Sequence, residues 1–265
     1  MSDAPEISSN PSNSQARFLD RANGVRIAYQ KLDGRNPKLP GLMFLGGFMS
    51  DMTGTKALYL EEHAKERGQA FLRLDYRGHG ASSGRFEDGT IGLWAEDALG
   101  VFDSLSEGPQ VLVGSSMGGW ISLLVARSRP DRVSALVGIA AAPDFTKSMW
   151  ESFSSEIRET ITRSGRCEMP SDYDDNPYVI TKDLIEDGAN QCLLGGKIPI
   201  KCPVRLLQGT ADTAVPWQTA MALLENLESE DAEALLVKDG DHRLSSPKDL
   251  ARLSKILDQL SGLNT

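Results

Sequence analysis

The apolar positions of this chain are spaced in two different ways. Short runs that are apolar throughout are typical of strands buried on both faces of a sheet. They predict strands at Gly41–Leu45, Ala70–Leu74, Gln110–Gly114, Ala135–Ala140, Pro203–Leu207 and Ala234–Val237. Two earlier strands, Phe18–Leu19 and Val25–Tyr29, flank Asn23-Gly24, which is a strong hairpin signal.

Helix-length segments separate most of these strands. They are Lys56–Arg67, Leu93–Leu105, Met117–Arg127, Trp217–Leu227 and Leu250–Leu260. Gly68 follows the first of them and is a typical residue for ending a helix. An opening hairpin followed by alternating strands and helices predicts an α/β fold, with a mostly parallel sheet covered on both faces.

One interval interrupts the alternation. Residues 144–200 contain amphipathic segments around Met149–Ile161 and Ile180–Leu194 but no convincing buried strand. We therefore expect a mainly helical cap inserted into a core made of residues 17–143 and 201–265. A long insertion after a strand usually lies over the functional end of the sheet, although a peripheral decoration is the alternative. We expect some of its apolar side chains to pack on the core and others to line an acyl site: Met149, Trp150, Phe153, Ile157, Ile180, Leu184 and Leu193.

Composition narrows the possible functions. A length of 265 residues suits one α/β domain, and a formal net charge of −9 disfavours nucleic acid and anionic membranes as partners. There is no apolar run long enough for a transmembrane helix. Residues 1–16 are polar, lack the features of a secretory or mitochondrial leader, and are expected to be disordered. The three cysteines fit no metal motif, and reduced thiols indicate a cytoplasmic protein.

The segment Gly114–Gly118, with the sequence GSSMG, forms the predicted turn between a strand and a helix. The central residue of so sharp a turn needs small residues two positions before and after it. Centring the turn on Ser116 gives glycine at both places, whereas Ser115 would have Val113 and Met117 there. Ser116 is therefore the predicted nucleophile; the alternative is a glycine-rich turn with a surface serine.

A serine nucleophile needs a base, and the chain has only three histidines. His63 lies among polar residues in a predicted helix, so we expect it at the surface. His79 lies in a glycine-rich turn after a strand, where a histidine more often binds neighbouring backbone. His242 follows the last predicted strand, at the sheet edge where α/β sites gather, and is the predicted base.

The base needs an orienting carboxylate from another strand end. Asp212 lies just beyond the predicted strand Val204–Leu207. Asp241 is the rival, but side chains of adjacent residues rarely point at each other. The resulting order, Ser116, Asp212 and His242, is the order associated with this kind of nucleophile turn.

The oxyanion formed during acyl transfer needs hydrogen-bond donors. The backbone N–H of Met117 follows the nucleophile at the start of a helix and is well placed. The loop LGGFMSD follows the third predicted strand, and its glycines, Gly46 and Gly47, allow close backbone approach. Phe48 is the residue whose N–H would face the oxyanion; a plain glycine turn is the alternative.

The sequence stretches LGGFMSD, DYRGHGASSG, GSSMGGW, LLQGTADTAVPW and GDHRL resemble those of the α/β-hydrolase family, from about Arg17 onward. The strings GTKAL, EGPQVLVGSSMGGW, IPIKCPVRLL and VPW are similar to the branch that contains a mitochondrial depalmitoylase, also described as an acyl-glucuronide esterase. Gly46 stands where many hydrolases carry histidine, which the same branch also lacks.

The resemblance implies an eight-stranded sheet and a serine hydrolase that cleaves acyl esters or thioesters of a small-molecule or acylated substrate. It places the nucleophile, acid and base on Ser116, Asp212 and His242, the oxyanion donors on Phe48 and Met117, and requires no metal or organic cofactor. Two alternatives stay open. One is another activity on this fold, such as a peptidase or carbon–carbon bond hydrolase, and the other is a non-catalytic ligand-binding module.

Overall fold

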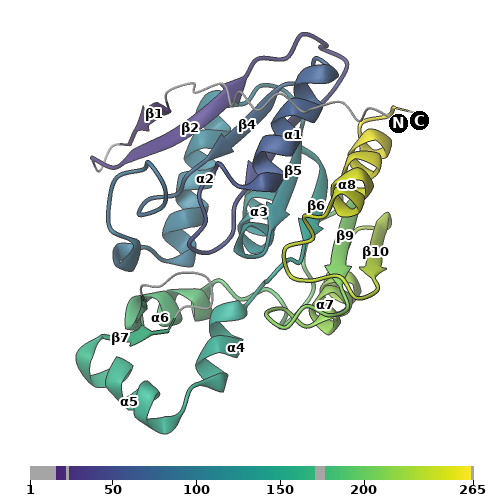
Figure 1. Cartoon of the computed structure of the whole chain (residues 1–265). Helices are drawn as coiled ribbons and strands as arrows, with labels where there is room; N and C mark the ends of the chain where they lie inside the picture. Colours follow the sequence, from purple (N-terminus) through teal and green to yellow (C-terminus); the bar gives the residue numbers. More distant parts are fainter. Residues whose placement is uncertain (1–15, 22–23, 171–176, 264–265) are drawn as a thin grey trace, which may run out of the picture.

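The computed structural model describes residues 16–21, 24–170 and 177–263. An eight-stranded sheet runs through its centre in the order β1-β2-β4-β3-β5-β6-β9-β10 (Figure 1). Strands β1 and β2 pair antiparallel, β2 pairs antiparallel with β4, and the other neighbours are parallel. The strands are β1 (Arg17–Asp20), β2 (Arg26–Leu32), β3 (Gly41–Leu45), β4 (Phe71–Leu74), β5 (Gln110–Ser115), β6 (Val133–Ile139), β9 (Val204–Gly209) and β10 (Ala232–Val237).

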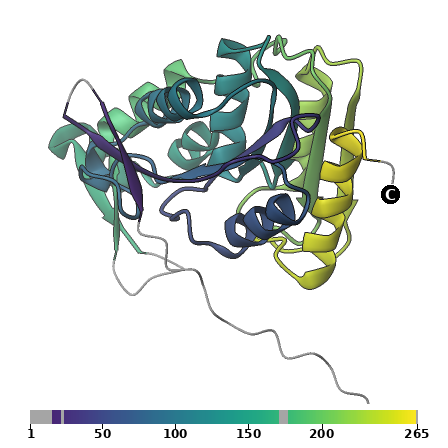
Figure 2. The same ribbon diagram turned by 90° about the horizontal axis from the view of Figure 1, so that it is seen from above.

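Helices cover both faces of this sheet. Helices α1 (Thr55–Glu66) and α8 (Pro247–Leu260) pack on one face, whereas α2 (Ile91–Leu105), α3 (Met117–Ser128) and α7 (Trp217–Asn226) pack on the other (Figure 2). Alternate residues of the central strands enter the two layers: in β3, Met43 contributes to one core cluster and Phe44 to the other. This arrangement confirms the predicted fold and explains why the central strands are apolar at most positions.

The interval 144–200, which we expect to form the cap, contains a small sheet that the sequence pattern did not predict. Strands β7 (Arg166–Met169) and β8 (Tyr178–Thr181) pair antiparallel between α5 (Ser155–Ser164) and α6 (Lys182–Asn190). Most of their residues are only half-buried or exposed, so they lack the apolar run by which the core strands were recognised. The amphipathic segment around Met149–Ile161 is covered by two helices, α4 (Phe145–Ser152) and α5, because the Ser154 side chain caps a new helix.

Specific hydrogen bonds join the two ends of this interval and attach it to the core. The buried carboxylate of Asp144, which follows β6, accepts from the N–H groups of Leu193 (2.7 Å) and Leu194 (2.9 Å) at the other end of the cap. Asp187 of α6 accepts from the N–H of Gly92 at the start of α2 (2.7 Å). These bonds close the base of the cap and hold it beside the carboxyl end of the sheet.

Two expectations fall on residues outside this description. The tail expected at residues 1–16 lies outside it, except for residue 16. The first residue of the Asn23-Gly24 turn also lies outside it. Within the described part of the chain, no helix is long and apolar enough to cross a membrane.

Candidate active site

Ser116 occupies the sharp turn between β5 and α3. Its backbone lies at φ 55° and ψ −120°, a conformation that is strained for a residue with a side chain. A Cβ atom on Gly114 would collide with the carbonyl group of Gly118, and one on Gly118 would collide with the carbonyl group of Leu45. The two glycines are therefore required by the close approach of strand and helix. They lie at the positions expected for a turn centred on Ser116.

Neighbouring backbone holds this strained turn in place. The N–H of Ser116 donates to the carbonyl of Ile139 (2.9 Å), and the carbonyl of Ser116 accepts from the N–H groups of Gly119 (2.9 Å) and Ala142 (3.1 Å). Ser115 ends β5 with a buried side chain. The hydroxyl group that reaches the surface of the turn is thus that of Ser116.

The structure brings the three residues predicted as a triad together from three separate strand ends. The Nε2 atom of His242 lies 3.1 Å from the Oγ atom of Ser116, and its Nδ1 atom lies 2.8 Å from an Oδ atom of Asp212. The carboxylate of Asp212 can only accept from His242, so Nδ1 carries a proton. In the neutral ring, Nε2 is then an acceptor facing the serine hydroxyl, which is the arrangement needed to remove its proton.

Other groups besides His242 also hold Asp212 as a carboxylate. Its Oδ1 atom accepts from the N–H groups of Ala214 (2.9 Å) and Val215 (2.8 Å), and its Oδ2 atom accepts from the Nε2 of Gln208 (2.9 Å). Burial opposes the ionisation of this carboxyl group. The hydrogen bonds from His242, Val215 and Gln208 outweigh burial and hold the pKa of Asp212 below its ordinary value.

Gln208 was not singled out from the sequence, although it orients the predicted acid. It is the second-last residue of β9 and also donates to the carbonyl of Val215 (3.0 Å), so it fixes the turn that carries Asp212. Its position four residues before Asp212 in LLQGTAD is the only sequence signal for this role.

The remaining candidates for acid and base lie in other surroundings. Asp241 accepts from the N–H of Leu244 (2.9 Å) and so caps its own loop. His63 is half-buried rather than fully at the surface, because α8 packs on α1 and places Asp258 within 3.1 Å of its Nε2. His79 is buried and contacts backbone groups of Arg77 and Met49.

The loop after β3 passes directly beside the serine turn. A Cβ atom on Gly47 would lie 3.4 Å from the Cβ of Ser116, which is near ordinary contact distance, so the loop lies beside the serine without glycine being required at position 47. Within the described chain, the N–H of Phe48 donates to no protein acceptor. Met117 is the first residue of α3, where N–H groups have no partner within the helix. Both predicted oxyanion donors thus lie next to Ser116.

A cavity of about 550 Å³ opens over Ser116 and His242. The loop Gly46–Asp51, the start of α1 and the His242 loop form most of its wall, and the described part of the cap contributes Pro170 and Tyr178. The seven apolar cap residues expected to pack on the core or line an acyl site are not in this wall. They instead pack against the core cluster, some buried and some partly buried: Met149, Trp150, Phe153, Ile157, Ile180, Leu184 and Leu193.

Lys56 joins the first helix to the loop of His242. Its Nζ atom donates to the carbonyl of Arg243 and lies 3.3 Å from the Oγ of Ser245. Burial lowers the pKa of Lys56 to about 8, although the charge of Asp241 opposes this shift. The lysine therefore supports the base loop from one wall of the cavity.

Comparisons with known proteins show the family of this chain. The sequence profile of the family described as "Serine aminopeptidase, S33" matches residues 43–183. The palmitoyl-protein thioesterase ABHD10, mitochondrial, of Bos taurus is 41% identical over 244 residues, which are 92% of this chain and 79% of that protein. The chain belongs to the α/β-hydrolase family.

Solved structures of similar hydrolases extend this result to the whole fold. Alpha/beta hydrolase domain-containing protein 10 from mouse superimposes with a TM-score of 0.85 at 39% identity, covering 93% of this hydrolase and 98% of that chain. A protein from Agrobacterium vitis S4 described as a hydrolase gives a TM-score of 0.89 at 40% identity, with 95% and 100% covered. Both superpositions therefore cover nearly the whole chain.

Proposed function

We propose that this hydrolase cleaves acyl esters or acyl thioesters through a covalent acyl-Ser116 intermediate. The observation that carries the proposal is the chain of contacts from Asp212 through His242 to Ser116, on a strained turn that faces a cavity. The relatives named palmitoyl-protein thioesterase support an acyl thioester as the substrate class.

In the first half of the reaction, Nε2 of His242 takes the proton of the Ser116 hydroxyl while Oγ attacks the acyl carbon. The negative oxygen that results accepts hydrogen bonds from the N–H groups of Phe48 and Met117. Asp212 stabilises the positive imidazolium. The proton on Nε2 then passes to the departing alcohol or thiol as its bond to the acyl carbon breaks.

In the second half, water takes the place of the leaving group. His242 removes a proton from that water, and the resulting hydroxide attacks the acyl-Ser116 carbon. Collapse of the second oxyanion releases a carboxylic acid and returns the proton to Ser116. The reaction draws only on side chains, backbone N–H groups and water.

The wall of the cavity combines three charged residues, Asp51, Lys56 and Arg243, with apolar surface that supports binding of an acyl group. Phe44, Phe48 and Met49 present apolar surface there, and Tyr178 approaches from the cap. The oxyanion loop is also tied to the cap side, since the rings of Phe48 and Tyr178 lie 6.2 Å apart between centroids. An acyl chain bound on this surface would remove apolar area from water.

A panel of matched substrates tests this proposal. The same acyl group is presented as an ester of p-nitrophenol, as a thioester of coenzyme A and as an amide of p-nitroaniline, and a burst of the first product is measured in stopped flow. We expect a burst equal to the enzyme concentration, and higher kcat/KM for the ester and thioester. Preferred cleavage of aminoacyl amides would instead support the peptidase alternative. The description of the matched family contains the word aminopeptidase.

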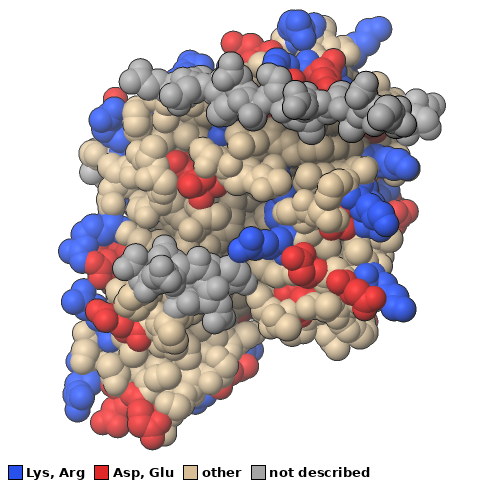
Figure 3. Space-filling model, viewed as in Figure 1, with Lys and Arg blue, Asp and Glu red and all other residues tan. Residues whose placement is uncertain are grey.

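A cytoplasmic location is also part of this proposal. All three cysteines are unpaired, which suits a reducing compartment. The ABHD10 relatives are named as mitochondrial, so fractionation of cells that express the full chain would distinguish the two locations. Acidic and basic side chains are interspersed on the face seen in Figure 3, which supports a small-molecule or acylated substrate rather than nucleic acid.

A further inference from the structure

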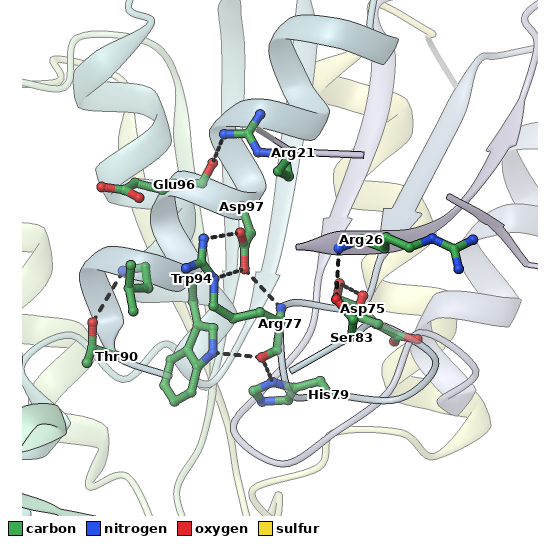
Figure 4. Close-up of polar contacts among 12 residues, drawn as sticks. Arg21, Arg26, Asp75, Arg77, His79, Ser83, Thr90, Trp94, Glu96 and Asp97 are labelled. Atoms are coloured by element: carbon green, nitrogen blue, oxygen red, sulfur yellow. Dashed lines mark hydrogen bonds and ion pairs between the residues drawn. The ribbon is translucent and has the colours of Figure 1, made fainter. Parts of the chain in front are cut away.

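His79, which the triad does not use, contacts the loop that carries a predicted oxyanion donor. Its side chain is 4% exposed. The Nε2 atom lies 3.3 Å from the backbone nitrogen of Met49, and the Nδ1 atom lies 3.2 Å from the carbonyl oxygen of Arg77. Figure 4 shows the second of these contacts. The histidine thus bridges the turn after β4 and the loop after β3.

The two partners determine where the ring proton lies. The backbone N–H of Met49 can only donate, so Nε2 of His79 must present its lone pair. The carbonyl of Arg77 can only accept, so Nδ1 must carry the proton. Burial lowers the pKa of His79, against the opposing effects of the Arg77 carbonyl and Asp97, which favours this neutral form at neutral pH.

The bond from His79 holds a strained part of the loop. Met49 has a φ of 58°, in the left-handed region that a residue with a side chain rarely adopts. Its N–H belongs to the peptide unit that begins at Phe48. The preceding peptide unit is held by Ser50, whose Oγ donates to the carbonyl of Gly47 (2.8 Å). Because a trans peptide is planar, this bond turns the Phe48 N–H to the opposite side.

His79 itself rests on a rigid support. Arg77 donates to both carboxylate oxygens of Asp97 on α2, at 2.9 Å and 2.7 Å, and the indole of Trp94 donates to the Arg77 carbonyl (3.1 Å) (Figure 4). The ring of Trp94 also lies edge-on to His79, with 5.1 Å between centroids. The support therefore extends from a buried ion pair through Arg77 and His79 to the oxyanion loop.

We propose that His79 is a positioning residue for the oxyanion hole. Its ring holds the Phe48–Met49 peptide so that the Phe48 N–H faces the oxyanion on Ser116. The proposal rests on the proposed function, because it assigns a role in the same acyl transfer. Ser50 holds the Gly47–Phe48 peptide on one side of Phe48, and His79 holds the Phe48–Met49 peptide on its other side. The Tyr76 hydroxyl donates to the carbonyl of Gly46 (3.3 Å), which precedes both peptides.

The test compares His79→Phe, which keeps a planar ring, with His79→Gln, which keeps an acceptor and a donor. Removing an oxyanion donor outright costs roughly 10²–10³ in kcat, so a loosened donor should cost about 10–100-fold in His79→Phe. We expect KM to change less than about twofold, and affinity for a trifluoromethyl ketone, which forms a tetrahedral adduct, to fall in parallel with kcat. His79→Gln should recover much of both losses.

His63→Gln is the matched control, because it replaces a histidine that contacts α8 far from the cavity. It should leave kcat unchanged. An unaltered kcat in folded His79→Phe, or a loss confined to KM or to the melting temperature, would overturn the proposal.

A measurement on the unmodified enzyme covers the case in which His79→Phe does not fold. Nitrogen-15 shifts of the histidine rings report the tautomer, and the proposal requires protonated Nδ1 and unprotonated Nε2 at His79. Protonated Nε2 would contradict it even if the enzyme is active. Lack of any hydrolysis by the unmodified enzyme would instead count against the proposed function alone, so the two failures are distinguishable.

Discussion

Asp212 is the residue whose surroundings make the sharpest prediction at the scale of single side chains. In Asp212→Asn the amide can still contact His242, but it favours the wrong tautomer and no longer stabilises the imidazolium. We expect kcat at pH 7 to fall by about 10⁴, with a much smaller change in KM. Steady-state kinetics on one ester measure both constants.

Asp241→Asn is the natural control for this substitution. Asp241 precedes His242 in the chain, but its carboxylate accepts from the N–H of Leu244 rather than from the imidazole. Its loss should change kcat less than about tenfold. Equal losses in Asp212→Asn and Asp241→Asn would remove the reason for choosing Asp212 as the acid.

The lowered pKa of Lys56 predicts how the free energy of unfolding depends on pH. Its pKa is about 8 in the folded chain and near its ordinary value of 10.5 when unfolded. Between these values the unfolded state binds more protons, so this residue makes the free energy of unfolding rise as pH increases from about 8 to 10. Urea titrations at several pH values should show a smaller rise in Lys56→Met than in the wild type; identical slopes would mean that the lysine is not desolvated.

At the scale of elements, Asp144 connects the two ends of the cap. Asparagine tolerates the left-handed backbone of this position (φ 60°) but offers only one of the two acceptor oxygens. We expect Asp144→Asn to lower the free energy of unfolding by about 1.5–3 kcal/mol, because a buried N–H loses a bond to a charged group. Urea unfolding measures this loss of stability. We expect faster proteolysis within the cap to accompany it.

Glu186→Ala, on the exposed side of α6, is the corresponding control. Its carboxylate lies 3.3 Å from Lys182 in an exposed ion pair, which contributes little. A change below about 0.5 kcal/mol is expected. If both substitutions destabilised the chain equally, Asp144 would not be a specific fastener of the cap.

The comparison of elements also shows what the sequence could predict. The central strands were predicted because they are buried on both faces and therefore apolar throughout. Strands β7 and β8 were not, because short half-exposed strands lack any regular apolar pattern. The meeting of Ser116, Asp212 and His242 was predictable because parallel strands bring their carboxyl ends together. The hydrogen bond from Gln208 to Asp212 and the contribution of Tyr178 to the cavity wall depend on tertiary packing, which the sequence pattern does not encode.

At the scale of the whole molecule, core loops together with Pro170 and Tyr178 line the cavity, and its size limits the acyl group. Each buried methylene adds at most about 0.8 kcal/mol, which is about fourfold in kcat/KM. A series of esters from acetyl to palmitoyl should therefore show kcat/KM rising over short and medium chains and levelling once the apolar wall is covered. A flat profile, or a strict preference for acetyl, would exclude an apolar acyl pocket.

The most direct measurement of the central claim is the intact mass of the protein after treatment with a fluorophosphonate, together with its esterase activity. The wild type and Ser115→Ala should gain one phosphonyl group, located on Ser116 by peptide mapping, and both should hydrolyse ester. Ser116→Ala should stay unlabelled and lose activity by about 10⁴-fold or more, with an unchanged melting temperature. Labelling and activity that persist in Ser116→Ala, or that disappear instead in Ser115→Ala, would contradict the assignment of Ser116 as the nucleophile.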